Sequence, residues 1–181
     1  MAKLYLILFL ATLMSGVGYA GYSYYMWSQE TMNTLRENNV KLKIIGSKKN
    51  FTHSFYNKVI TTCSTTWKNT GLNVNIALNY GGREEILNAV NSLNEDMKKG
   101  KLKGKITEKR LQKYLYTSDI PDPDLVIRTS GEQRLSNFLL WQSAYSELYF
   151  TDVYWPDFRK AEFCKAVLDF QQRKRRFGKS E

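Results

Sequence analysis

The residues with the clearest chemical potential lie in segment 124–150, where an apolar triplet runs into a polar turn that contains glycine. Arg128 and Arg134 flank this turn, and a guanidinium group suits two-pronged contact with phosphate oxygens. The apolar spacing that resumes at Ser136 predicts a helix with this serine as its N-cap, so backbone N–H groups and a positive helix end would face the turn. The pattern predicts an anion site. An ordinary strand–loop–helix connection with two solvated arginines fits the same residues.

A carboxylate near the arginines adds a second chemical element. Glu147 can hold Mg²⁺ that bridges diphosphate oxygens, or it can be a structural partner of one of the two arginines. No phosphate-binding G-x-x-x-x-G-K-[ST] loop and no G-x-S-x-G nucleophile turn occurs in the chain. Because His53 is the only histidine, the sequence argues against triad hydrolysis and against a histidine-rich metal site.

Composition indicates one folded domain with an anionic partner. The 181 residues are 43% hydrophobic and carry a formal charge of +10, which attracts nucleic acid, acidic membrane surfaces or phosphorylated substrates. Much of the positive charge lies in residues 98–113 and 173–179, and such runs are typical of solvated faces or tails. Cys63 and Cys164 lie in apolar helical patterns, which predicts buried free thiols and a reducing compartment. Nucleic-acid binding is disfavoured because no recognisable binding motif is present.

The N-terminal segment, residues 1–29, differs from the rest of the chain. Residues 4–29 carry no charge and are long enough to span a bilayer as a signal-anchor helix. A cleaved signal peptide, a buried helix and an artefact of the gene start remain alternatives. The positive charges that follow favour a cytoplasmic domain over residues 30–181, with membrane association through residues 4–27.

Strand and helix patterns alternate through this domain. The strand patterns cover residues 40–46, 72–78, 125–127 and 148–150, and the helical spacings cover 52–68, 82–97, 107–115, a stretch from 136 and a last helix after 157. Alternation predicts an α/β fold, a parallel sheet covered by helices, here preceded by an apolar N-terminal helix. Because ligands collect at the carboxyl ends of such strands, residues 46, 79–82 and 128–131 are expected at one rim.

The run RTSGEQRLSNFLLWQSAYSELYFTDVYWPDF resembles the C-terminal signature of the cis-prenyltransferases, the undecaprenyl diphosphate synthase family. NTGLNVNIALNYGGREEI and the terminal RKRRFG resemble the same family in the same order. The resemblance extends over residues 34–178, roughly the last three fifths of a usual member. It implies condensation of isopentenyl diphosphate with an allylic diphosphate to a cis-polyprenyl diphosphate, dependence on Mg²⁺, and a dimer.

The resemblance assigns roles to individual residues. Arg128, Arg134 and Ser136 correspond to the residues that hold the isopentenyl diphosphate group. Glu147 corresponds to the Mg²⁺-linked glutamate. The C-terminal R-x-G element, Arg176 to Gly178, reaches across the dimer to the partner's substrate site. Gln133 stands where many relatives have histidine, which leaves any proton or metal role at this position in doubt.

The sequence departs from the family at its beginning. No D-G-N-G-R-W-like motif is present, so the family's catalytic aspartate is not assigned to any residue. The resemblance then implies a truncated form with the isopentenyl diphosphate half-site, and little turnover by this chain alone, because catalysis needs both diphosphates together. The alternative is a non-catalytic, membrane-anchored partner subunit of a two-subunit enzyme, in a heterodimer rather than a homodimer.

Overall fold

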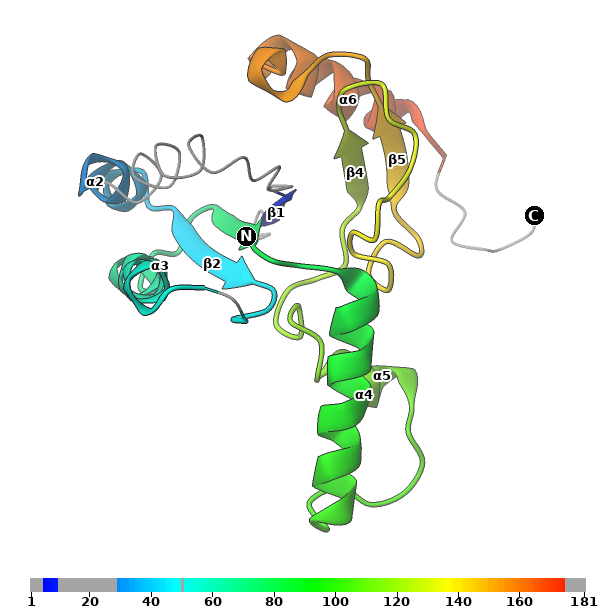
Figure 1. Ribbon diagram of the computed structural model, residues 1–181. Coiled ribbons are helices and arrows are strands. Elements are labelled where there is room, and N and C mark those ends of the chain that lie inside the picture. The colour runs from blue at the N-terminus through cyan, green and yellow to red at the C-terminus, as the bar shows by residue number, and fades with distance from the viewer. Residues whose placement is uncertain (1–4, 10–28, 50, 175–181) are drawn as a thin grey trace. The chain divides into compact units, whose positions relative to one another are not determined.

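Parallel strand pairing organises both parts of the chain (Figure 1). The structure is a computed structural model that describes residues 5–9, 29–49 and 51–174. It consists of two compact units, Met1–Ile120 and Pro121–Glu181, and each unit is described by itself. Helices and parallel strands follow one another along the chain, which confirms the predicted α/β class.

The first unit contains a three-stranded parallel sheet in the order β1-β3-β2. Its strands are β1 (Tyr5–Phe9), β2 (Lys41–Ile45) and β3 (Asn73–Ala77), and its helices are α2 (Gln29–Glu37), α3 (His53–Thr66), α4 (Gly82–Lys98) and α5 (Glu108–Gln112). Asn73 of β3 is in register with Tyr5 of β1 on one side and with Lys41 of β2 on the other. β3 is therefore the central strand of this sheet.

The predicted N-terminal helix is wrong at its beginning, because Tyr5–Phe9 forms strand β1 and pairs with β3. A short apolar run of this kind fits a buried parallel strand as well as a helix, and only the neighbouring strand decides between them. The remainder of the apolar segment, residues 10–28, lies outside the described residues. Among the helices that the structure describes, none is both long enough and apolar enough to cross a bilayer.

The core of the first unit lies between the sheet and helices α2 and α3. Leu42, Val59, Ile76 and Leu78 form its buried cluster. The side chains packed against this cluster come from the two helices, the sheet and the loop before α3, and they are Leu35, Ile44, Phe51, Phe55 and Val74. One polar bond crosses the same interface, since the backbone N–H of Leu42 donates to the hydroxyl of fully buried Thr66 at 3.1 Å. Apolar packing and this bond fix α3 against β2.

The carboxyl ends of β2 and β3 meet at one rim, as predicted for residues 46 and 79–82. Ser47 N–H donates to the carbonyl of Asn79 at 3.1 Å, and the Asn79 amide donates to the carbonyl of Lys49 at 3.0 Å. Gly46 has φ +123°, and a Cβ at this residue would lie 2.0 Å from the carbonyl oxygen of Leu78. The two strand ends approach so closely that only glycine fits.

A buried carboxylate organises the chain after this rim. Glu85, in the first turn of α4, is 1% exposed. It accepts hydrogen bonds from the hydroxyl of Tyr80 and from the backbone N–H of Tyr116, the latter at 2.8 Å. Because buried carboxylates are costly without partners, these bonds hold the loop after β3, helix α4 and the segment near Tyr116 together.

The second unit contains a two-stranded parallel sheet and one long helix. Its elements are β4 (Leu125–Arg128), β5 (Glu147–Phe150), the short 3₁₀ helix η1 (Trp155–Asp157) and α6 (Lys160–Gln172). The strands thus pair in two separate sheets, whereas a single sheet was predicted. Residues 128–131 belong to this second unit, so their place on the same rim as residues 46 and 79–82 stays a prediction.

The two cysteines differ in exposure. Cys63 in α3 is partly buried, and this burial raises the pKa of its thiol, against a smaller lowering by a hydrogen bond with the backbone of Ile44. Cys164 is exposed, because α6 buries Ala166 and turns Cys164 outward. The predicted burial of Cys164 is therefore wrong.

The close approach at Gly46 predicts a large loss of stability for Gly46→Ala. The new methyl group meets a backbone carbonyl, so we expect the free energy of unfolding to fall by about 3 kcal/mol or more. Urea unfolding measures this change. Gly100→Ala is the matched control, because Gly100 also has positive φ (+71°) but no atom within 4 Å of its added Cβ. It should cost only about 1 kcal/mol. Equal losses in the two variants would contradict the steric explanation.

The ion pair between Asp119 and Lys43 predicts a pH dependence of stability. Burial acts to raise the pKa of Asp119, but the hydrogen bond and charge of Lys43 outweigh it, so this pKa lies below its ordinary value. A carboxyl with a lowered folded pKa stabilises the fold above the unfolded pKa of about 3.9, and the contribution disappears as pH falls through the folded pKa. Asp119→Asn should cost at most about 1 kcal/mol at pH 7, because the pair is largely exposed. It should also weaken the acid dependence below pH 4 in unfolding measurements. An unchanged acid dependence would rule this contribution out.

Candidate functional site

Two backbone N–H groups of the turn after β4 are bonded within the chain and are not offered to a ligand. Ser130 N–H donates to the carbonyl of Val153, and Gly131 N–H donates to the carbonyl of Thr151, both at 3.0 Å. Thr151 N–H in turn donates to the carbonyl of Arg128 at 3.0 Å. These bonds tie the turn to the chain that follows β5. These two N–H groups are therefore already bonded within the chain, and the predicted anion site stays a prediction that depends on the other groups of the turn.

The helix predicted from Ser136 is also absent. Ser136, Asn137 and Leu139 have φ values of +48°, +63° and +44°, which a right-handed helix cannot contain. Residues 136–145 form a succession of turns, with Phe138 N–H bonded to the carbonyl of Leu135 at 3.0 Å. Ser136 is therefore not a helix N-cap, and no helix dipole faces the arginines from this segment.

The cationic side chains of the turn remain available for an anion. Arg134 is 65% exposed and forms an ion pair with its close neighbour Glu132. Arg128, at the carboxyl end of β4, is partly buried, and its guanidinium makes no ion pair or hydrogen bond with the residues that the structure describes. Ser136 is exposed. All three lie on the connection that leaves the carboxyl end of β4, although no hydrogen bond between described residues joins them.

Glu147 lies away from Arg128 on the β4–β5 sheet. Glu147 is in register with Leu125, whereas Arg128 is in register with Phe150. Three residues along a strand correspond to about 10 Å, and side chains three positions apart point to opposite faces. The structure therefore brings Arg128, Arg134 and Ser136 into one segment but places Glu147 at the other end and on the other face of the same strand pair.

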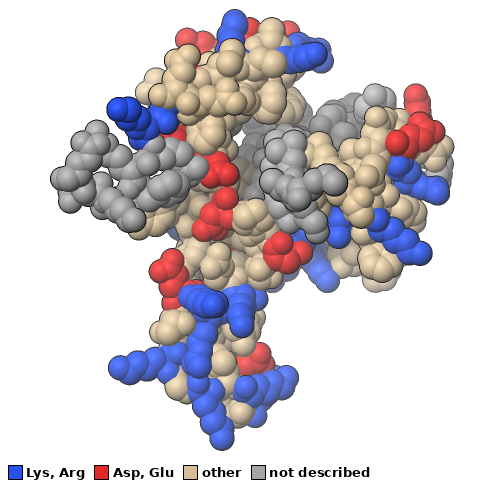
Figure 2. Space-filling view, turned by 180° about the vertical axis from the view of Figure 1, so that it is seen from behind, with Lys and Arg blue, Asp and Glu red and all other residues tan. Residues whose placement is uncertain are grey.

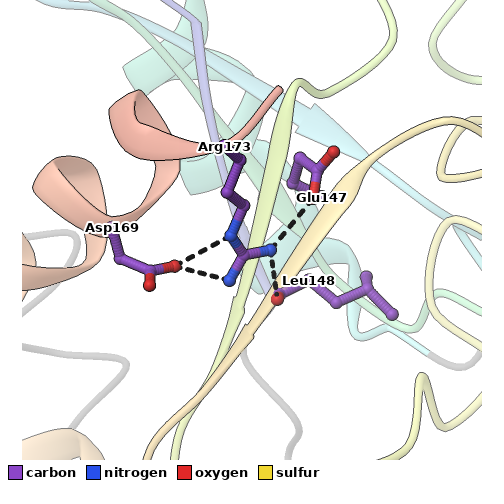
Figure 3. Close-up of polar contacts among 4 residues, drawn as sticks. All are labelled: Glu147, Leu148, Asp169 and Arg173. Atoms are coloured by element: carbon purple, nitrogen blue, oxygen red, sulfur yellow. Dashed lines mark hydrogen bonds and ion pairs between the residues drawn. The ribbon is translucent and has the colours of Figure 1, made fainter. Parts of the chain in front are cut away.

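The partner of Glu147 is Arg173, at the C-terminal end of α6 (Figure 3). Arg173 Nη1 donates to Glu147 Oε2 and to the carbonyl of Leu148, both at 3.0 Å. Its Nε donates to Asp169 Oδ2 at 2.9 Å, and its Nη2 binds the same oxygen. The hydrogen bond to Glu147, followed by that to Asp169, raises the pKa of Arg173. A structural ion pair of Glu147 was one of the two predictions, but its partner is neither Arg128 nor Arg134.

Most lysines of the basic run 98–113 belong to the first unit's surface. Figure 2 shows Lys and Arg side chains gathered over the end of α4 and the region of α5. Lys98 pairs with Glu95, and Arg110 Nη1 donates to the carbonyls of Lys103 and Lys105 at 2.8 Å. Through these two bonds Arg110 fixes the loop before α5, at residues 103 and 105, to the helix itself. This basic surface is distinct in sequence from the arginines of the turn after β4.

Glu147 is the residue of the second unit that was predicted to hold a divalent cation. Glu147 is a hard oxygen donor whose side chain is 28% exposed, and a carboxylate that accepts from one guanidinium keeps further lone pairs for a metal. Mg²⁺ characteristically takes one or two protein carboxylates and completes its shell with phosphate oxygens and water. Within the described part of the chain, no group of three or more His, Cys, Asp or Glu converges on one point. Glu147 therefore fits a cation only with oxygens supplied by a substrate or solvent.

Two sequence features lie outside the described residues. The R-x-G element at Arg176 and Gly178 is one of them, so its reach toward a partner stays a prediction. The other is residues 16–21, which spell G-x-G-x-x-G and were not among the predicted sites. On its own, this pattern is a weak sign of dinucleotide binding.

Comparison with known proteins identifies the relatives of the chain. A family described as "Putative undecaprenyl diphosphate synthase" matches residues 12–178. An isoprenyl transferase of Streptococcus pyogenes is 53% identical over 150 residues, which are 80% of this chain and 60% of the relative. A ditrans,polycis-undecaprenyl-diphosphate synthase of Pasteurella multocida, farnesyl-diphosphate specific, is 51% identical over 148 residues, 81% of this chain and 62% of the relative. The chain thus spans about three fifths of the length of these curated relatives.

Solved structures give the same result. The lavandulyl diphosphate synthase from Lavandula x intermedia, in complex with dimethylallyl diphosphate, matches with a TM-score of 0.89 at 27% identity, over 97% of this chain and 79% of that one. The probable undecaprenyl diphosphate synthase of Campylobacter jejuni matches with a TM-score of 0.80 at 30% identity, over 97% and 84% of the two chains.

The geometry around Glu147 predicts energetic coupling between Glu147 and Arg173. Glu147→Gln and Arg173→Gln should each lower the free energy of unfolding by about 1 kcal/mol, because the pair is only partly exposed and carries charged hydrogen bonds. In the double variant the losses should be smaller than their sum by about 0.5 kcal/mol or more. A double-mutant cycle in urea measures this coupling. Lys165→Gln is the control, since Lys165 pairs with Glu162 on the surface of the same helix. Strictly additive losses would show that the contact carries no stability.

Proposed function

Because the chain belongs to the undecaprenyl diphosphate synthase family, we propose that it takes part in cis-prenyl transfer, the condensation of isopentenyl diphosphate with an allylic diphosphate. Its own contribution is the side of the site that binds isopentenyl diphosphate. The observation that carries this proposal is the pair of arginines on the connection after β4, in a chain about half identical to isoprenyl transferases.

Side chains, rather than backbone N–H groups, bind the diphosphate in this proposal. Arg128 has no competing partner among the described residues, and its guanidinium can take two phosphate oxygens at once. Arg134 is paired with Glu132, but exposed pairs of this kind contribute only about 0–1 kcal/mol. A diphosphate carries more charge than one carboxylate, so it displaces Glu132 from Arg134. The exposed hydroxyl of Ser136 adds a further hydrogen bond.

Holding the nucleophile is the catalytic contribution of these residues. In prenyl transfer the double bond of isopentenyl diphosphate attacks the allylic carbon, the allylic diphosphate leaves as an anion, and a proton is lost from the isopentenyl unit. Arginines that fix the isopentenyl diphosphate convert a bimolecular encounter into a reaction of positioned groups. Mg²⁺, when bound, would neutralise the charge of a diphosphate. We assign Glu147 of this chain to it, a carboxylate that lies apart from Arg128 at the other end of the β4–β5 strand pair.

Partners complete the proposed site. The allylic diphosphate is the second substrate, and a second family member, in a homodimer or a heterodimer, receives the R-x-G element at Arg176 and Gly178. The match leaves about two fifths of each relative's length uncovered. Binding of isopentenyl diphosphate and turnover are therefore separate questions for this chain, and each needs its own measurement.

Isothermal titration with isopentenyl diphosphate tests the proposed binding residues. Arg128→Gln and Arg134→Gln should each weaken binding by about tenfold or more, because each removes charge-assisted hydrogen bonds worth about 1.5–3 kcal/mol. The matched control is Arg159→Gln, an exposed arginine at the start of α6, which should bind like the wild type. Unchanged affinity in both test variants would refute the assigned site. Incorporation of labelled isopentenyl diphosphate with farnesyl diphosphate and Mg²⁺ measures turnover independently of binding.

A further inference from the structure

Arg173 occupies the outer edge of strand β5. Glu147 N–H donates to the carbonyl of Asp124 at 2.9 Å, and Thr151 N–H donates to that of Arg128, so alternate residues of β5 direct their backbone groups toward β4. Leu148 lies between them, and its carbonyl points away from β4. Arg173 donates to this outward carbonyl and, through the same nitrogen, to Glu147. The guanidinium therefore bridges the end of α6 and the beginning of β5.

The cluster around this guanidinium contains more negative than positive charge. Two carboxylates, Glu147 and Asp169, share one guanidinium, so the three side chains carry a net charge of −1. Arg173 and Glu147 are 30% and 28% exposed, and Asp169 is 46% exposed. An ion from solvent can therefore reach the carboxylates. If the guanidinium moves away, two oxygen donors are left facing the position that it occupied.

We infer that Arg173 is an internal competitor of a divalent cation for Glu147. This inference rests on the proposed assignment of Glu147 to the metal. Arg173 already supplies a positive charge 3.0 Å from Glu147 Oε2, and a dication approaching the same oxygen is repelled by that charge. Glu147 keeps further lone pairs for a cation, but the charge of Arg173 weakens cation binding as long as the guanidinium stays in place. Withdrawal of Arg173 would remove this repulsion and would also release its bond to Leu148. The C-terminal end of α6 and the occupancy of Glu147 are coupled by this exchange.

The test is a titration of the full chain with MnCl₂, read by isothermal calorimetry, in the presence of isopentenyl diphosphate. Removal of the competing charge in Arg173→Gln should tighten Mn²⁺ binding on the order of tenfold. Arg173→Lys keeps the charge but not the guanidinium fork, so it should bind Mn²⁺ within about threefold of the wild type. Lys165→Gln removes a positive charge from the same helix without touching Glu147, and it should leave the affinity unchanged.

The outcomes separate this inference from the proposed function. If Glu147→Gln weakens Mn²⁺ binding but Arg173→Gln does not tighten it, the competition is refuted while the metal role of Glu147 stands. If Glu147→Gln leaves Mn²⁺ affinity unchanged, the metal assignment itself fails. Circular dichroism of each variant checks the fold. Should Arg173→Gln not fold, a tightening of about tenfold or more in Arg173→Lys would overturn the charge-competition explanation, because its charge is retained.

Discussion

The parallel register of β4 and β5 is the constraint on which the chemistry of the second unit depends. It sets Arg128 at the carboxyl end of the strand pair and Glu147 at the amino end, on opposite faces. The hydrogen bonds of the turn after β4 follow from the same register, because Thr151 continues the ladder beyond β5 and places its carbonyl where Gly131 reaches it. One pairing pattern thus engages two backbone donors of the candidate anion site, those of Ser130 and Gly131, and separates its arginine from its carboxylate.

Two ion pairs of arginine with glutamate in this unit have different physical character. Arg134 and Glu132 are close neighbours in the sequence and largely exposed, so solvent screens their attraction and an incoming anion competes easily. Arg173 joins acceptors from a strand and a helix and is less exposed, so it contributes to holding α6 in place. The Arg134–Glu132 pair at the turn can therefore be replaced by a bound anion, whereas the Arg173–Glu147 pair at the end of α6 is a structural contact.

Much of this fold was predictable from local pattern. Helix α3 and strand β3 follow from apolar spacing. Gly46 marks the end of β2, because its positive φ and the nearby carbonyl of Leu78 leave no room for a side chain. The failures have different origins. Residues 5–9 are a strand because β3, distant in sequence, pairs with them, and Glu147 binds Arg173, which is also distant in sequence. Residues from Ser136 form turns despite a helical apolar pattern, because three of them have positive φ. Spacing along the chain carries no information about these features.

Strands at the margin of a sheet expose a row of unpaired backbone groups and invite pairing with other chains. In β5 these backbone groups lie along the segment from Leu148 to Phe150, an apolar sequence of high strand propensity. Arg173 occupies a carbonyl of this margin with a charged, solvated group. Replacement of the arginine that we connect with cation binding would therefore leave this carbonyl open to pairing with another chain.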